Sequence, residues 1–247
     1  MNIITYLINL DGSDQRLKQA SEQLNRLNIP FTRVPAFDGR QLDLQSVPEY
    51  DQTHAIGYMG RILNGGELGC YFSHLDCARR FLATDAQYAI VLEDDMQLSA
   101  NTSDVIAQTL AWLEQQKMDW YLLHIGANKR KIYTTLTTIS DRELMRAHYF
   151  PMTTTGLVWS RQGAQAFINE HSTIFAPVDN YLRWWLTKNN KGLSIWPPLV
   201  TTTGAQSEID GRTAKRKSGG RSKMYGITKQ RRLWSDKFVA LFHKYIR

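Results

Sequence analysis

The sequence predicts a single α/β domain with a mostly parallel central sheet. Short apolar runs rich in β-branched residues alternate along the chain with segments whose apolar residues recur at helical spacing. The runs at residues 3–10 and 31–37 flank such a helical segment, and this strand–helix–strand order is typical of parallel strands. We therefore expect a Rossmann-like domain within residues 1–210.

The individual elements follow from local patterns. Strands are expected at 3–10, 31–37, 88–92, 120–125, 153–159 and 194–200, the last interrupted by two prolines. Helices are expected between Ser13 and Pro30 and at 68–83, 102–116, 162–171 and 178–186. Residues 42–60 give mixed signals and are expected to be irregular, and residues 129–149 are polar and weakly patterned.

The composition is that of a soluble globular protein, with 43% hydrophobic and 21% charged residues. Cys70 and Cys77 are too few for a disulfide framework and match no zinc-ligand spacing, so we expect free thiols in a reducing compartment. The first residues lack the pattern of a signal peptide, and no apolar run reaches the length of a membrane span. The sequence therefore predicts a cytosolic protein.

Positive charge is concentrated at the C-terminal end. Residues 211–247 carry a net charge of +11, whereas residues 1–210 carry −4, so the basic character belongs to a tail and not to the domain. Residues 207–222 are rich in Gly, Ser and Lys and are expected to be mobile. The acidic body and the absence of a recognised motif argue against nucleic-acid binding.

The tail also contains an amphipathic helical pattern. Trp234, Phe238, Leu241, Phe242 and Tyr245 recur at helical spacing and form one apolar stripe. The basic residues around this stripe are Arg231, Arg232, Lys237 and Lys244. Such a helix is typical of proteins that bind an anionic membrane surface. The alternative is that the helix packs on the domain and leaves its charges in water.

An acidic cluster follows the strand expected at 88–92. Glu93, Asp94 and Asp95 stand at the carboxyl end of that strand, where parallel sheets bind ligands. Adjacent carboxylates repel one another unless a cation offsets them, and hard divalent cations prefer oxygen ligands. Alternation in an extended segment directs Glu93 and Asp95 to one side, so both are candidate metal ligands, with Asp95 the direct one. The alternative is a solvated turn.

Several further motifs carry a family resemblance. The pieces are Tyr6–Leu10 followed by Arg16, Ala36–Gly39, Gly66–His74, Val91–Asp95, Thr155-Gly156, Gly163-Ala164, Pro177–Asp179 and Pro197-Pro198. In this order they resemble the bacterial lipooligosaccharide glycosyltransferases of glycosyltransferase family 25, which are related to the collagen galactosyltransferases. The resemblance implies a GT-A-like fold, a nucleotide-sugar donor, a divalent metal and inversion at the anomeric carbon.

The resemblance and the local chemistry together indicate a donor site. Asn9, Leu10 and the helix that begins near Ser13 would frame the nucleotide, and Arg16 would meet a phosphate because helix N-termini favour anions. Asp38 is expected near the base or ribose. The remaining candidates for donor contact are Glu67, Ser73, His74, Glu93, Asp94, Thr155 and Gly156. Arg16 as a surface charge and Asp38-Gly39 as a plain turn remain alternatives.

Inversion requires a general base that takes the proton of the acceptor hydroxyl. Asp179 is the first candidate, because it precedes the aromatic residues Trp184 and Trp185, of which at most one is expected to line a sugar site. Glu208 is the rival and Asp210 the third candidate. The alternative role for Asp179 is a helix N-cap.

The resemblance therefore implies an inverting glycosyltransferase with Mn²⁺ or Mg²⁺ as its cofactor. It would transfer galactose, in a β-1,4 linkage, from UDP-galactose to the core of a lipid-linked oligosaccharide. A cytoplasmic enzyme peripheral to the inner membrane, held by the C-terminal tail, would suit this acceptor. Three alternatives stay open: UDP-glucose as the donor, a metal-dependent phosphohydrolase that uses the same acidic cluster, and a non-enzymatic adaptor built on the basic tail.

Overall fold

The computed structural model describes residues 1–170, 173–203 and 221–246. Its strands are β1 (Ile3–Asn9), β2 (Thr32–Pro35), β3 (Tyr88–Glu93), β4 (Met96–Leu98), β5 (Leu122–His124), β6 (Thr134–Ile139), β7 (Arg142–Arg146), β8 (Gly156–Ser160), β9 (Gly192–Trp196) and β10 (Val200–Thr202). Its helices are α1 (Asp14–Arg26), the 3₁₀ turn η1 (Leu44–Ser46), α2 (Gln52–Met59), α3 (Gly65–Leu82), α4 (Thr102–Gln115), α5 (Arg161–Glu170), α6 (Val178–Asn189) and α7 (Tyr225–Tyr245).

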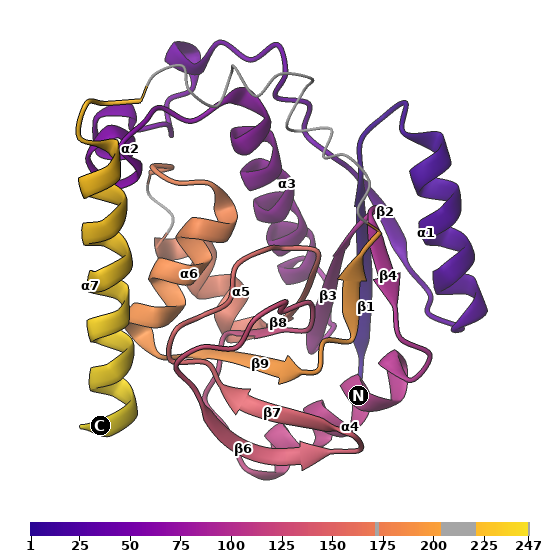
Figure 1. Cartoon of the computed structure of the whole chain (residues 1–247). Coiled ribbons are helices and arrows are strands. Elements are labelled where there is room, and N and C mark those ends of the chain that lie inside the picture. The colour runs from indigo at the N-terminus through magenta and orange to yellow at the C-terminus, as the bar shows by residue number, and fades with distance from the viewer. Residues whose placement is uncertain (171–172, 204–220, 247) are drawn as a thin grey trace.

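The predicted α/β fold with a mostly parallel sheet is confirmed. The large sheet has the order β2-β1-β3-β8-β5-β9-β7-β6. β1 pairs in parallel with β2 and β3, and β5 pairs in parallel with β9. Only β8 and β7 oppose the other strands of this sheet in the described part of the chain. The carboxyl ends of β1, β2 and β3 therefore meet at one edge (Figure 1).

Both faces of the sheet are covered, which explains why its central strands read as continuous apolar runs. Tyr6 and Ile8 of β1 belong to the core shared with α2, α3, α5 and α6, whereas Leu7 belongs to the core shared with α1 and α4. β3 alternates in the same way, with Val91 on the first side and Leu92 on the second. The alternation of side chains along a strand produces this division.

The short strand β4, which pairs with β10 in a second sheet, was not predicted, and two longer stretches also differ from the prediction. Residues 42–60, expected to be irregular, contain η1 and α2. The signals for α2 are Asp51, whose side chain accepts a hydrogen bond from His54 N, and Gly60, which ends the helix in the left-handed region with φ 75°. The weakly patterned stretch 129–149 contains the β6–β7 hairpin, which extends the sheet at its edge, where one face can stay polar.

The C-terminal helix lies against the domain. α7 packs on α2 and α6 at the side of the molecule opposite α1 (Figure 1). Among the described residues, no helix has both the length and the apolar character needed to cross a bilayer. The predicted boundary at residue 210, the mobile stretch up to residue 220 and the candidate bases Glu208 and Asp210 lie outside the described residues.

Candidate functional site

A pocket of about 120 Å³ opens beyond the carboxyl ends of β1, β2 and β3. The N-terminal half of α3 forms its opposite wall. Its lining residues are Ile8, Asn9, Leu10, Arg16, Ala36, Phe37, Asp38, Gly39, Arg40, Gly66, Cys70, Ser73, His74, Glu93, Asp94 and Asp95. The position is the one predicted for a ligand of a parallel sheet.

The pocket brings together most of the predicted donor-site residues from four separate segments. Those on its lining are Asn9, Leu10, Arg16, Asp38, Ser73, His74, Glu93, Asp94 and Asp95. Glu67, Thr155 and Gly156 are not part of the lining. The lining residues Phe37, Arg40 and Cys70 were not among the predicted site residues, although all three lie within or beside the family motifs.

Glu67 does not line the pocket, because its carboxylate forms hydrogen bonds at the N-terminus of α3. It accepts from Asn64 N at 2.9 Å in a capping box, and Asn64 Oδ1 accepts from Glu67 N at 2.8 Å. Arg61 donates to both carboxylate oxygens, at 2.8 and 2.5 Å. The predicted donor contact by Glu67 is thus replaced, in this structure, by a role in positioning α3.

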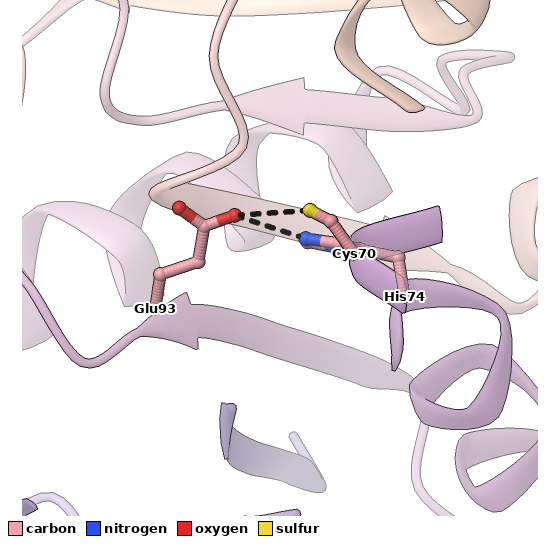
Figure 2. A group of neighbouring side chains, drawn as sticks. All are labelled: Cys70, His74 and Glu93. Atoms are coloured by element: carbon pink, nitrogen blue, oxygen red, sulfur yellow. Dashed lines mark hydrogen bonds and ion pairs between the residues drawn. The ribbon is translucent and has the colours of Figure 1, made fainter. Parts of the chain in front are cut away.

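Three side chains converge on a single oxygen of Glu93, and Figure 2 shows two of them, Cys70 and His74. His74 Nε2 lies 3.2 Å from Oε1, Thr154 Oγ1 donates to it at 2.6 Å, and Cys70 Sγ lies 4.0 Å away. Burial by itself would raise the pKa of Glu93, but the hydrogen bonds from His74 and Thr154 hold that pKa below its ordinary value. Glu93 is therefore a carboxylate held ionised at the wall of the pocket.

Asp94 points toward α1. Its carboxylate accepts from Asn9 Nδ2 at 2.7 Å and from Arg16 Nη1 at 3.1 Å. Arg33 Nε donates to Asn9 Oδ1 at 2.9 Å, which fixes the orientation of the Asn9 amide. As expected from the alternation of side chains, Asp94 is directed away from the Glu93 cluster, and its partners join the ends of β1 and β3 to the first turn of α1.

Asp95 differs from Glu93 and Asp94 in its hydrogen bonding. Its buried Oδ1 has no hydrogen-bond partner among the described residues. Burial and the nearby charge of Glu93 raise the pKa of Asp95 to about 6. Its backbone is fixed, because Thr203 N donates to Asp95 O at 2.8 Å. A buried carboxylate oxygen without a donor, beside a second carboxylate, is suited to a cation.

Two donor sets could hold a metal ion at this pocket. Asp95 and Glu93 offer the oxygen ligands that Mg²⁺ and Mn²⁺ prefer, so the predicted metal fits the residues present. Cys70, His74 and Glu93 form a second, softer set, whose ligand atoms lie within 4.8 Å of one another (Figure 2). Burial, followed by the charge of Glu93, raises the pKa of the Cys70 thiol well above its ordinary value. Cys70 is accordingly a neutral thiol in this structure.

The other end of the pocket is apolar and aromatic. Phe37 is 48% exposed, and its ring is backed by Phe72 at a centroid distance of 5.2 Å. Phe37 N donates to Ser73 Oγ at 2.9 Å, and Ser73 Oγ donates to Gly69 O at 2.7 Å. Ser73 therefore attaches the loop after β2 to α3 at the backbone of Phe37.

Glycines allow this loop to touch α3. A Cβ at Gly39 would lie 1.8 Å from Gly65 O, and a Cβ at Gly69 would lie 2.3 Å from Phe37 O. The glycines of the two family motifs thus serve a close backbone contact. Next to it, Arg40 donates to both carboxylate oxygens of Asp38, which lowers the pKa of Asp38 to about 2.

Asp179 lies near the start of α3 but outside the pocket lining. Burial raises its pKa, and Asn180 N and Nδ2 donate to its Oδ1 at 2.6 and 2.9 Å. The charge of Glu67 adds to the rise in the Asp179 pKa, and the charge of Asp179 adds to the rise in the pKa of the Cys70 thiol. The helix begins after Pro177, so Asp179 is not the N-cap. Trp185 is buried in the core, and Trp184 is partly buried and packs against it. Neither tryptophan lines the pocket.

His124 is a further positioning residue that the sequence analysis did not identify. Its Nε2 lies 3.0 Å from both Met152 O and Thr153 O, and its Nδ1 accepts from Gly126 N at 3.1 Å. Thr153 has a φ of 80°, which is unfavourable for a β-branched residue. His124 holds this strained residue in place, so that the next one, Thr154, reaches Glu93. No local sequence pattern marks this pairing.

Comparisons with known proteins agree with the family resemblance. A family model described as "Glycosyltransferase family 25 (LPS biosynthesis protein)" matches residues 2–182. A Xenopus laevis protein named procollagen galactosyltransferase 1-B is 28% identical over 182 residues, which cover 72% of this chain. The human protein named procollagen galactosyltransferase 2 is 25% identical over 222 residues, or 80% of this chain. The chain spans 30% and 34% of the length of these two relatives.

The solved structures that the chain resembles are more distant in sequence. The crystal structure of S. aureus TarS 1–349 in complex with UDP-GlcNAc has a TM-score of 0.45 and 12% identity, over 86% of this chain and 62% of that one. The glycosyltransferase GlyE of Streptococcus pneumoniae TIGR4 has a TM-score of 0.44 and 10% identity, over 97% of this chain and 62% of that one.

Proposed function

The chain belongs to glycosyltransferase family 25, and we propose that it transfers galactose from UDP-galactose to a sugar of a lipid-linked oligosaccharide, with inversion at the anomeric carbon. The observation that carries this proposal is the pocket itself. It joins Asp95, whose buried Oδ1 has no hydrogen-bond donor among the described residues, to the exposed aromatic ring of Phe37 within one cavity. A nucleoside diphosphate has the same polarity, with an anionic end that needs a cation and a flat base.

The proposed donor would lie along the pocket, with its pyrophosphate at one end and its base at the other. The pyrophosphate would lie at Asp95 and at Arg16, which stands in the first turn of α1. The base would lie on Phe37, with Asp38 and Arg40 at the rim. Ser73 supports this arrangement because it fixes the loop that carries Phe37.

Asp95 and Glu93 would hold Mn²⁺ or Mg²⁺. Such an ion, when bound, neutralises the charge that develops on the departing diphosphate. The surrounding residues fix the positions of the carboxylates that would bind this ion. Thr154 and His74 fix the Glu93 carboxylate, and Asn9 and Arg16 hold Asp94 away from it.

Asp179 is the proposed general base for the acceptor hydroxyl. Burial raises its pKa, which makes its carboxylate a better proton acceptor than an exposed aspartate. It interacts electrostatically with Cys70, which lines the donor pocket, and with Glu67 in the first turn of α3. The rival Glu208 lies outside the described residues.

The sugar and the acceptor come from the relatives. Two relatives are named procollagen galactosyltransferases, and the family description refers to LPS biosynthesis. These names support galactose and a lipid-linked bacterial oligosaccharide; we propose a β-1,4 linkage and a location at the cytoplasmic face of the inner membrane. Glucose is the alternative donor sugar, because it differs from galactose by one stereocentre.

The test is incubation of the full chain with UDP-galactose or UDP-glucose and Mn²⁺, with and without oligosaccharide acceptors. We expect UDP release that depends on both acceptor and metal, and a product heavier by one hexose. Asp95→Asn should abolish metal-dependent turnover. Asp85→Asn, an exposed acid before β3 at the opposite edge of the sheet, is the matched control. Phosphate release from monoesters without any acceptor would instead indicate a phosphohydrolase.

A further inference from the structure

α7 presents an apolar face to solvent. Its exposed large apolar residues are Ile227, Trp234, Phe238, Leu241, Phe242 and Tyr245, followed by Ile246. At 100° per residue these positions fall on one side of the helix, which we call the outer face of α7. Phe238 is 65% exposed and Tyr245 is 72% exposed. Surface helices normally bury such a stripe, so its exposure requires an explanation.

The polar side of the same helix is directed inward. Asp236 Oδ2 accepts from Arg183 Nε of α6 at 3.1 Å, and both side chains are buried. His243 Nε2 lies 3.1 Å from Lys188 O. The Arg232 guanidinium lies 5.1 Å from the centre of the Tyr58 ring on α2. These contacts fix the rotation of α7, so the outward direction of its apolar side is part of the fold.

The outer face carries positive charge and no acid. Asp236 is the only acidic residue of α7, and it is buried against Arg183. Arg231 and Lys244 are exposed, and Lys237 is half-buried. Lys237 Nζ lies 4.6 Å from the Trp234 ring centre, and Lys244 Nζ lies 5.3 Å from that of Tyr245. The ammonium groups therefore stand directly beside the aromatic rings.

We propose that the outer face of α7 docks on a membrane surface that contains anionic lipids. Indole and phenol rings partition to the headgroup region of a bilayer, and the neighbouring lysines attract anionic headgroups. The helix would lie flat in the interface, with its polar side held by α2 and α6. The proposal is independent of the proposed sugar transfer, because it rests on α7 alone.

A second copy of the chain fits this surface less well. Two outer faces brought together would place Arg231, Lys237 and Lys244 against the same residues of the other copy, with no acid on the outer face to offset them, because Asp236 is buried against Arg183. An anionic lipid surface meets both features, because it offers an apolar layer and negative charge. Charge complementarity therefore selects the lipid surface over self-association.

The test is flotation of the full chain with phosphatidylcholine vesicles, with and without phosphatidylglycerol. We expect binding to the anionic vesicles that weakens with salt, and little binding to phosphatidylcholine alone. Phe238→Ser combined with Phe242→Ser should weaken binding by about tenfold or more. Lys237→Gln combined with Lys244→Gln should weaken binding to anionic vesicles by about tenfold. Lys18→Gln with Arg26→Gln, on exposed positions of α1, is the matched control and should bind like the parent.

Size-exclusion chromatography of the same proteins separates the remaining outcomes. A concentration-dependent dimer that fails to float and dissociates in the Phe238→Ser, Phe242→Ser variant would overturn the proposal in favour of a second copy. A monomer that does not float with either vesicle would overturn it as well. All these substitutions are at positions with exposed or half-buried side chains, so unchanged circular dichroism is the check on folding.

Discussion

The hydroxyl of Thr154 donates to Glu93 Oε1 at 2.6 Å across 61 positions of sequence. The same oxygen faces His74 Nε2 and the Cys70 thiol, so donors from two distant segments converge on one carboxylate. β8 makes this convergence possible, because it lies beside β3 and carries the preceding loop to the strand end. The geometry of Glu93 is therefore built by the sheet and by α3 together.

Thr154→Val should weaken the site without unfolding the domain. The hydrogen bond to a charged carboxylate contributes about 1.5–3 kcal/mol, so we expect kcat/KM for transfer to fall about tenfold or more. The matched control is Thr138→Val at an exposed position of β6, which should leave kcat/KM unchanged. Equal kcat/KM values in both variants would show that Thr154 does not position Glu93.

Asp179→Asn should lower kcat by about 100-fold or more and leave the affinity for UDP little changed, because an amide cannot accept the proton. Asn180→Ala is the control, since it removes the amide that donates to Asp179 and keeps the carboxylate. If Asp179 only stabilised the start of α6, both variants would lower thermal stability and kcat to the same extent.

Phe37→Ala should weaken the binding of UDP by about tenfold or more, because stacking of a base on an aromatic ring is worth about 1–3 kcal/mol. The half-exposed ring contributes little to the core, so the free energy of unfolding should stay close to that of the parent. Phe238→Ala, which removes an exposed ring on α7, is the matched control in the same calorimetric titration. UDP binding that is indifferent to Phe37 would place the base elsewhere.

The buried His124 should make the stability of the protein depend on pH. Burial lowers its pKa to about 4 from the ordinary 6.5, so the unfolded chain binds this proton more readily than the folded one. The contribution of His124 to the free energy of unfolding is complete above pH 6.5. It is lost as the pH falls toward 4, by about 3 kcal/mol in total. Urea unfolding at pH 7 and pH 5 measures the loss, which should be smaller in His124→Gln. An identical loss in parent and variant would contradict the assignment to His124.

Asp236→Asn should destabilise the protein by about 3–5 kcal/mol, because it leaves the buried Arg183 guanidinium without a counter-charge. The control is Asp141→Asn, which removes the exposed carboxylate that pairs with Arg142 and should cost less than about 1 kcal/mol. Denaturant unfolding compares the two variants. Similar small losses in both would mean that the Arg183–Asp236 pair does not fix α7 to α6.

Local patterns identified β1, β2, β3, β5, β8 and β9, most helices and the acidic strand end, but not β4, β6 or β7. Apolar runs and polar turns predicted β1, β3 and α3, and the alternation along β3 predicted that Asp94 turns away from Glu93. The same approach missed α2, whose Asp51 and Gly60 are short-range signals within a mixed stretch. It also missed Phe37 and Cys70 as lining residues, because each is indistinguishable in sequence from a core residue.

The sequence alone determined the class of the fold, the edge of the sheet where the pocket opens and the amphipathic character of α7. Only the tertiary structure decided which side of α7 faces solvent, because Asp236 finds its partner Arg183 at a distance of 53 positions. It also decided that His74 and Thr154 contact Glu93, and that His124 contacts the neighbouring Thr153. Periodicity reports the side of an element that is apolar, whereas the partner of a buried polar group is chosen by packing between elements that are far apart in the chain.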